Sequence, residues 1–204
     1  MFLKHRNSQK RIIIKDCVYF VTTKTYNNHP FFIEPLFGDL FVENLKLCKQ
    51  LKGFDLYAWF LGYDHFHLLL KPNGEFGLSE IIQFLKRHVT RNINIIIGNQ
   101  QHKTPSEGDI GQYRLQNDEQ FMIQNFDNYV SNLKTQFQTT NLNHNPTHTF
   151  NWQKSYHDHF IRNKRDFNNH WEYIKYNPIK HNLPSDWKYH FLNPNYENLI
   201  DNPF

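Results

Sequence analysis

The sequence predicts an α+β domain built from a small β-sheet and several amphipathic helices. The first observation is a hairpin pattern over residues 55–71, where two apolar runs flank a short turn sequence. The second is a helical pattern over residues 78–98, where apolar side chains recur at helical spacing. The third is the presence of further strand-like and helix-like segments before and after these two. Together these observations indicate a mixed domain of strands and helices.

The predicted structure begins with a strand over residues 18–25, which are rich in β-branched and aromatic side chains. The sequence from Asn27 to Pro30 ends this strand. Apolar residues then recur at close to helical spacing over residues 36–51, and Gly53 is a natural stop. These segments supply the first strand and the first helix.

The hairpin over residues 55–71 carries the first candidate site. Its turn is predicted at residues 62–64, because Gly and Asp tolerate turn backbone angles. Side chains alternate along a strand, so His65 and His67 point to one face while Phe66 points toward a core. Two such imidazoles can converge on one metal ion. The plainer reading is a half-buried strand in a chain that has 13 histidines.

The helix over residues 78–98 has the most regular pattern, and Gly98 is a natural C-cap. Its apolar stripe would face the sheet. Basic side chains lie on other faces and are candidates for phosphate contact: Lys86, Arg87 and Arg91. A solvated helix surface is the plainer reading of these charges.

Residues 99–150 lack a regular pattern and are predicted to be an insertion with one helical piece near residues 126–137. A strand with its approach is predicted over residues 150–162. A last helix is expected from near Asn163 to Pro178, where the proline limits its continuation.

This element order is the βαββαβ plan of a ferredoxin-like sheet, with an additional C-terminal helix. Helices are expected to cover one face of the sheet and to leave the other face free for a ligand. Residues 15–190 are predicted to form one domain that contains the insertion at about 99–150, and residues 191–204 form a C-terminal tail. The aromatic segment from residue 183 onward is expected to lie over the domain without much regular structure.

The composition fits a cytoplasmic protein. A chain of 204 residues suits one domain with an elaboration, and a net charge of +4 permits nucleic-acid binding without requiring it. Cys17 and Cys48 are far apart and match no disulfide or zinc pattern, which fits a reducing compartment. No apolar run approaches the roughly 20 residues of a membrane span. Residues 1–15 lack the long apolar core of a signal peptide.

The last predicted helix carries the second half of the candidate site. Tyr173 and Asn177 are four positions apart, so their side chains lie one turn apart on the same face. If this face meets the sheet, a phenol and an amide oxygen approach the two imidazoles, which permits metal-assisted attack on phosphorus by the phenol. Tyr176 is a rival nucleophile, and Lys175 and Lys180 are further candidates for phosphate contact.

These motifs together resemble the single-tyrosine HUH transposases of insertion sequences, above all their REP-associated branch. Three features carry the resemblance, in this order: His65-Phe66-His67 after an apolar strand, the helix over residues 78–98, and Tyr173-Ile-x-x-Asn177-Pro178. The resemblance covers roughly residues 15–98 and 150–190. The turn before the histidines and the length of the insertion depart from the family pattern.

The resemblance implies that His65, His67 and Asn177 bind a divalent metal, Mg²⁺ or Mn²⁺, and that Tyr173 is the catalytic nucleophile. It implies a single-stranded DNA endonuclease and strand transferase that forms a 5′-phosphotyrosine intermediate at hairpin-associated sites. The implied partner is single-stranded DNA with hairpin structure. The protein would act as a monomer or homodimer in the bacterial cytoplasm, associated with the nucleoid through DNA.

Two other functions fit the same pattern. A non-catalytic nucleic-acid-binding module derived from a transposase would keep the fold without cutting DNA. A metal phosphodiesterase that uses water would not need the tyrosine. The intact His-x-His and Tyr-x-x-x-Asn patterns argue against lost chemistry, and a Tyr173→Phe variant separates the transposase from the phosphodiesterase.

Overall fold

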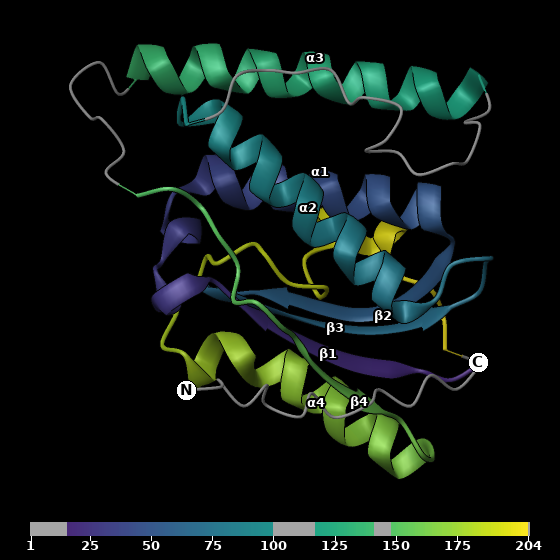
Figure 1. Cartoon of the computed structure of the whole chain (residues 1–204). Coiled ribbons are helices and arrows are strands. Elements are labelled where there is room, and N and C mark those ends of the chain that lie inside the picture. Colours follow the sequence, from purple (N-terminus) through teal and green to yellow (C-terminus); the bar gives the residue numbers. More distant parts are fainter. Residues whose placement is uncertain (1–15, 100–116, 141–147, 204) are drawn as a thin grey trace, which may run out of the picture.

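The computed structural model describes residues 16–99, 117–140 and 148–203. Within these residues, the centre of the molecule is an antiparallel sheet with the order β2-β3-β1-β4 (Figure 1). Its strands are β1 (Tyr19–Lys24), β2 (Phe54–Leu61), β3 (His65–Pro72) and β4 (His157–Phe160). The α+β class and the ferredoxin-like plan predicted from the sequence are confirmed.

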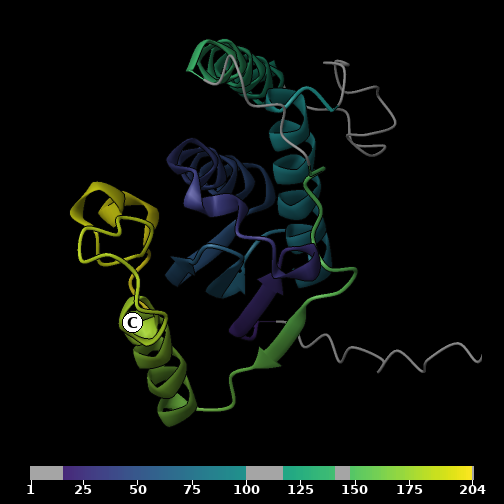
Figure 2. The ribbon, with the colours of Figure 1, turned by 90° about the vertical axis from the view of Figure 1, so that its left-hand side faces the viewer.

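Helices lie on both faces of the sheet. Helices α1 (Pro35–Lys52) and α2 (Leu78–Ile96) pack on one face, and α4 (Lys164–Lys180) packs on the other, against β2 and β3 (Figure 2). Helix α3 (Asn117–Thr140) lies across the outer side of α1 and α2 (Figure 1).

The prediction of a second sheet face free for a ligand is therefore wrong. This face carries aromatic side chains, and α4 covers them: Phe20 contacts His170 at 4.7 Å between ring centroids, and Phe60 stacks on His181 at 6.2 Å. Burying these rings favours packing of the last helix on the sheet. A ligand must therefore approach the site beside α4.

The predicted insertion over residues 99–150 lies partly outside the described residues, and the segment over residues 1–15 lies wholly outside them. The described part of the insertion contains α3, where the sequence indicated one helical piece.

The main core lies between the sheet and the pair α1 and α2. Phe66, Leu68 and Leu70 are buried in it, as the alternation along β3 predicts. Every member of the predicted apolar stripe of α2 is also buried: Leu78, Ile81, Ile82, Leu85, Val89, Ile93 and Ile96. The local patterns therefore predicted correctly which sides of β3 and α2 face this core.

The β2–β3 turn lies at residues 62–64, as predicted, and its Gly62 backbone lies directly against His65. The Gly62 N–H donates a hydrogen bond to the carbonyl of His65 at 2.8 Å. A Cβ atom at position 62 would lie 2.9 Å from Cε1 of the His65 ring, closer than non-bonded atoms pack. The turn therefore has a glycine where the imidazole folds back over the backbone.

Helix α4 begins where the sequence indicates but ends later. The Asn163 side chain accepts a hydrogen bond from the Asp166 N–H at 3.0 Å, which is an N-cap. The predicted end at Pro178 is wrong, because the helix continues to Lys180. Proline removes one N–H donor in the final turn, yet the His181 N–H still donates to the Asn177 carbonyl at 3.0 Å. The two additional helical residues include Lys180, whose ammonium contacts the Tyr173 hydroxyl.

The C-terminal segment covers the exposed edge of β2. The Leu61 N–H donates to the Tyr189 carbonyl at 3.0 Å, and the Phe191 N–H donates to the Trp59 carbonyl at 3.0 Å. Backbone pairing of this kind removes an open sheet edge that could pair with another chain. A short 3₁₀ helix, η3 (Pro194–Leu199), follows.

The aromatic residues of this segment have packing roles, as the sequence favoured. Trp187 Nε1 donates to the Leu61 carbonyl at 2.8 Å, and the Tyr189 hydroxyl donates to the Pro35 carbonyl at 2.6 Å. Tyr189 is buried on α1 directly over Gly38.

Substitution of Gly38 by alanine is expected to destabilise the fold. The added Cβ would lie 2.3 Å from Cζ of Tyr189, so the ring and its tail segment must move. Overpacking of this kind costs about 1–3 kcal/mol, against a gain of about 1 kcal/mol in helix propensity. Urea unfolding of G38A, Y189L and the double variant measures the coupling. We expect G38A to cost much less in the Y189L background, and simple additivity would contradict the proposed clash.

The tail is also expected to loosen in acid. His190 forms an isolated antiparallel β-bridge with Phe60. Burial lowers the pKa of His190, and a hydrogen bond with the backbone of Trp187 opposes this shift. The folded state therefore holds this imidazole neutral, so its stabilising contribution is complete above about pH 6.5 and falls as the pH drops below that value. Urea unfolding between pH 5.5 and 8 should show a shallower pH dependence for His190→Gln than for the unmodified chain. An identical dependence would contradict this role.

Candidate metal and nucleophile site

The two halves of the predicted site meet between the sheet and α4. His65 and His67 project from β3, and their ring centroids are 5.0 Å apart. The Tyr173 ring on α4 lies 5.2 Å from the His67 ring. Asn177, one turn further along α4, lies beside the same imidazole and opposes the lowering of its pKa by burial. The structure thus brings together two pairs of residues that lie more than 100 positions apart in the sequence.

The donor atoms of this cluster are buried and incompletely bonded. His65 and His67 are 4% and 3% exposed, and Asn177 is fully buried. Among the described residues, five buried side-chain polar atoms lack a hydrogen-bond partner, and two of them are His67 Nε2 and Asn177 Oδ1. Leaving such atoms unpaired costs free energy, so a bound cation would stabilise both of them. An imidazole nitrogen and an amide oxygen are suitable donors to a divalent cation, and the residues present fit a metal.

Neighbouring side chains fix the orientation of both imidazoles. Thr22 Oγ1 is hydrogen-bonded to His67 Nδ1 at 2.8 Å, and the Asp64 carboxylate is hydrogen-bonded to His65 Nδ1 at 2.6 Å. The bond from His65 lowers the pKa of Asp64. Each imidazole therefore uses Nδ1 for a protein partner, which leaves Nε2 available, as in many protein metal sites. No local sequence pattern identifies Thr22, because only strand pairing places it beside His67.

The surroundings favour the neutral, metal-binding form of His67. Burial lowers its pKa well below the usual value, and the nearby groups of His65, His181 and Lys180 act in the same direction, while Asn177 opposes them. A neutral imidazole keeps the lone pair that binds a metal. His181, which the sequence analysis did not select, lies with its ring centroid 4.6 Å from that of His65.

Tyr173 connects this buried cluster to solvent. Its side chain is 37% exposed, and Lys180 Nζ donates a hydrogen bond to its hydroxyl at 3.1 Å. The same ammonium lies 4.5 Å from the centre of the ring. Tyr176 is 52% exposed, and its ring lies 5.3 Å from the ammonium of Lys175. Of the two tyrosines, Tyr173 is therefore the one that the described contacts join to the histidines.

The predicted phosphate-binding residues fall into two groups. Lys180 lies on α4 beside the site, whereas Lys175 on the same helix pairs with Glu172 at 3.5 Å. Lys86, Arg87 and Arg91 lie on α2, on the other face of the sheet; Lys86 donates to the Gln153 carbonyl at 2.8 Å, and Arg91 pairs with Asp127 of α3 at 3.3 Å. The phosphate-binding role of all five residues stays a prediction.

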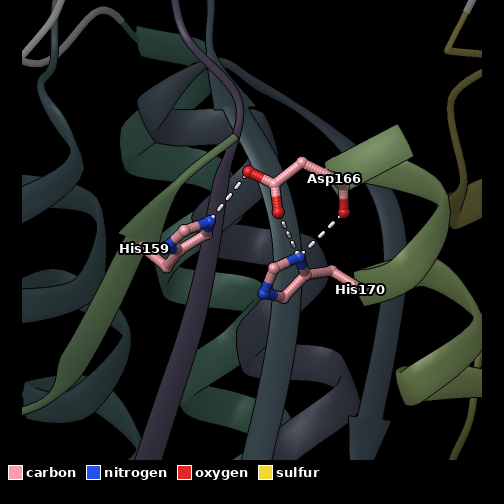
Figure 3. A group of neighbouring side chains, drawn as sticks. All are labelled: His159, Asp166 and His170. Carbon is pink, nitrogen blue, oxygen red and sulfur yellow. Dashed lines mark hydrogen bonds and ion pairs between the residues drawn. The ribbon is translucent and has the colours of Figure 1, made fainter. Parts of the chain in front are cut away.

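A second group of donors lies nearby, between β4 and α4. His159, Asp166 and His170 each place a possible ligand atom within 4.8 Å of the others, so the group could hold a metal ion (Figure 3). The sequence signal for it was a histidine on a short strand followed by Asp and His four positions apart at the start of a helix. This group was not among the predicted site residues.

Comparison with known proteins supports the resemblance drawn from the motifs. No protein-family model matches the chain. Over 41 residues it is 44% identical to a Haemophilus influenzae protein provisionally described as a REP-associated tyrosine transposase. A solved structure of a REP-associated tyrosine transposase bound to a REP hairpin matches with a TM-score of 0.60 at 17% identity, over 97% of this chain and 89% of that chain. The chain resembles the REP-associated tyrosine transposases.

The likeness to REP-associated tyrosine transposases that the sequence predicted is thus confirmed, and the structural match shows a shared fold. The sequence match spans 19% of this chain and 23% of the Haemophilus protein. A Deinococcus radiodurans R1 protein, provisionally described as a transposase, gives a TM-score of only 0.43 at 14% identity, which is too low for a structural argument. Within the described ranges, no helix has the length and apolar character that crossing a bilayer requires.

Proposed function

We propose that this chain is a metal-dependent single-stranded DNA endonuclease and strand transferase that forms a 5′-phosphotyrosine intermediate at hairpin-associated sites. The observation that carries the proposal is the pair of unpartnered buried atoms, His67 Nε2 and Asn177 Oδ1, beside the partly exposed Tyr173. A site of this kind combines metal ligands with a nucleophile that DNA can reach.

In this proposal His65, His67 and Asn177 would hold Mg²⁺ or Mn²⁺, and the cation would neutralise negative charge on the scissile phosphate. Thr22 and Asp64 keep the two imidazoles turned toward that position through the bonds to their Nδ1 atoms. The sheet and α4 exclude water from the side of the cluster that faces the protein.

Tyr173 attacks the phosphorus through its hydroxyl oxygen, which gives up its proton. A bond forms between this oxygen and phosphorus, and the bond from phosphorus to the 3′ oxygen breaks. The departing 3′ oxygen takes up a proton, so the products are a 5′-phosphotyrosine and a free 3′ hydroxyl. Attack by another 3′ hydroxyl reverses the step and joins two strands without an external energy source.

Lys180 has a defined place in this reaction. Its ammonium donates to the Tyr173 hydroxyl oxygen and so stabilises negative charge there while the proton leaves. The same charge favours departure of that oxygen when the strands rejoin. We therefore propose that Lys180 assists the nucleophile Tyr173, in addition to its predicted contact with DNA phosphate.

The proposed partner is single-stranded DNA that folds into a hairpin. This rests on the fold shared with a REP-associated tyrosine transposase whose structure holds a REP hairpin. We propose that residues 15–190 act as one domain, as a monomer or homodimer, in the cytoplasm of a bacterial cell. Lys180 lies beside the nucleophile, where a strand would pass.

The experiment that tests this function is adduct formation. The chain is incubated with Mn²⁺ and single-stranded hairpin oligonucleotides taken from both sides of its gene, and a denaturing gel separates protein joined to DNA. We expect an adduct that EDTA prevents and that fully paired duplex DNA does not give. Cleavage without an adduct would indicate a phosphodiesterase that uses water. Binding without cleavage across the whole flanking region would indicate a binding module.

A further inference from the structure

The group formed by His159, Asp166 and His170 lies outside the proposed catalytic cluster and has no part in the reaction described above. His159 comes from β4, whereas Asp166 and His170 come from the first turns of α4 (Figure 3). Their side chains are 35%, 11% and 22% exposed, so an ion in solution can reach them. We propose that these three residues bind a second metal ion of the transition series, with Zn²⁺ as the best fit, that fastens α4 to β4.

The spacing of the donor atoms already suits such an ion. His159 Nε2 lies 2.9 Å from Asp166 Oδ2, and His170 Nδ1 lies 3.3 Å from Asp166 Oδ1. Two donors about 2.1 Å from a tetrahedral zinc ion are about 3.4 Å from each other. The imidazole rings stack with 22° between their planes, so both rings would rotate about their side-chain bonds to turn their nitrogens toward one ion.

The proton count is compatible with metal binding. Without a metal, a proton on each of these nitrogens serves the hydrogen bonds to Asp166. When a metal binds, each neutral imidazole carries its proton on the other ring nitrogen, so the rings need only change tautomer. His170 gives up its bond to the Asp166 carbonyl, which a helical backbone N–H continues to satisfy.

Neighbouring donors fix the orientation of the Asp166 carboxylate. The Arg162 N–H and Nε donate to Asp166 Oδ2 at 3.1 and 3.2 Å, in the manner of the outer hydrogen bonds that orient a metal-bound carboxylate. Two imidazoles with one carboxylate select zinc and similar metals over Mg²⁺.

The ion would act on the position of the nucleophile. Phe20 packs between the two clusters, with its ring centroid 4.7 Å from that of His170, 5.7 Å from that of Tyr173 and 5.3 Å from that of His67. Tyr173 is three residues after His170, on the next turn of α4. A metal bond between β4 and the start of α4 would therefore limit movement of the tyrosine helix over the sheet.

The test counts metal ions and does not depend on DNA cleavage. The full chain with His67→Ala, which disables the first cluster, is stripped with EDTA and titrated with Zn²⁺ against a coloured chelator. We expect about one tightly bound equivalent, which also raises the melting temperature. Adding H159A or H170A should weaken zinc binding by more than about 100-fold and remove the thermal shift. Adding H157A, on the same strand, is the matched control and should change neither readout.

The competing explanation for this cluster is a hydrogen-bond network around Asp166 that binds no metal. It predicts equal zinc binding in the His67→Ala chain with and without H159A, and that result would overturn the proposal. If H159A does not fold, Asp166→Asn replaces it, because the amide oxygen still accepts a hydrogen bond while the metal-binding charge is lost. Undiminished zinc binding by that variant would also overturn the proposal.

Discussion

Replacement of Tyr173 by phenylalanine is expected to abolish the protein–DNA adduct. The substitution removes only the oxygen that forms the bond to phosphorus, and the ring keeps its contacts with Phe20 and His67. Loss of a covalent nucleophile leaves no route to the intermediate, so we expect at least about a 1,000-fold fall in adduct yield. A denaturing gel with labelled hairpin DNA measures the yield, and a native gel measures binding, which should change by less than about threefold.

Tyr176→Phe is the matched control, because it removes the same atom from the next tyrosine on α4. Tyr176 is exposed and its ring lies beside Lys175. We expect this variant to keep its adduct. The opposite pattern, with the adduct lost in Tyr176→Phe and kept in Tyr173→Phe, would assign the nucleophile to Tyr176.

Replacement of Asn177 by leucine is expected to separate metal binding from stability. Among the described residues its side-chain oxygen accepts no hydrogen bond, while its Nδ2 donates to the Tyr173 carbonyl at 2.6 Å. The leucine removes a buried oxygen that destabilises the metal-free protein, and it also removes the hydrogen bond made by Nδ2. Because these two effects on stability oppose each other, the free energy of unfolding without metal should change by less than about 1 kcal/mol. Affinity for Mn²⁺ at this cluster should fall by more than about 100-fold, and adduct formation should fall with it.

Thermal melting with and without Mn²⁺ checks this separation. We use the His159→Ala background here, so that the second cluster does not contribute to metal binding. The parent chain should gain melting temperature with Mn²⁺, and Asn177→Leu should gain much less. Equal gains in the two proteins would show that Asn177 does not bind the metal. His67→Ala should cause the same loss of Mn²⁺ binding, because it removes a proposed ligand on β3 instead of one on α4.

Several features follow from local sequence patterns because they depend on a few neighbouring residues. The alternation along β3 determines that His65 and His67 share one face and that Phe66 faces the core. The helical spacing of apolar residues similarly identifies the buried side of α2. The four-residue step from Tyr173 to Asn177 places both on one side of α4. The predicted catalytic group could therefore be proposed as a set.

Other features depend on which surfaces meet, and a local pattern does not contain that information. Packing of α4 over Phe20 and Phe60 buries the histidines that the sequence placed on an open face. The continuation of α4 past Pro178 brings the Lys180 ammonium to the Tyr173 hydroxyl.

The contribution of β4 is decided in the same way. Pairing of this short strand with β1 carries His159 toward Asp166 and His170 on α4. The amino-acid sequence by itself thus determined most of the elements, the sides of β3 and α2 that face the core, and the candidate ligands His65, His67 and Asn177. Only the tertiary structure decided which of these ligands lie together, because long-range packing and strand pairing set those distances.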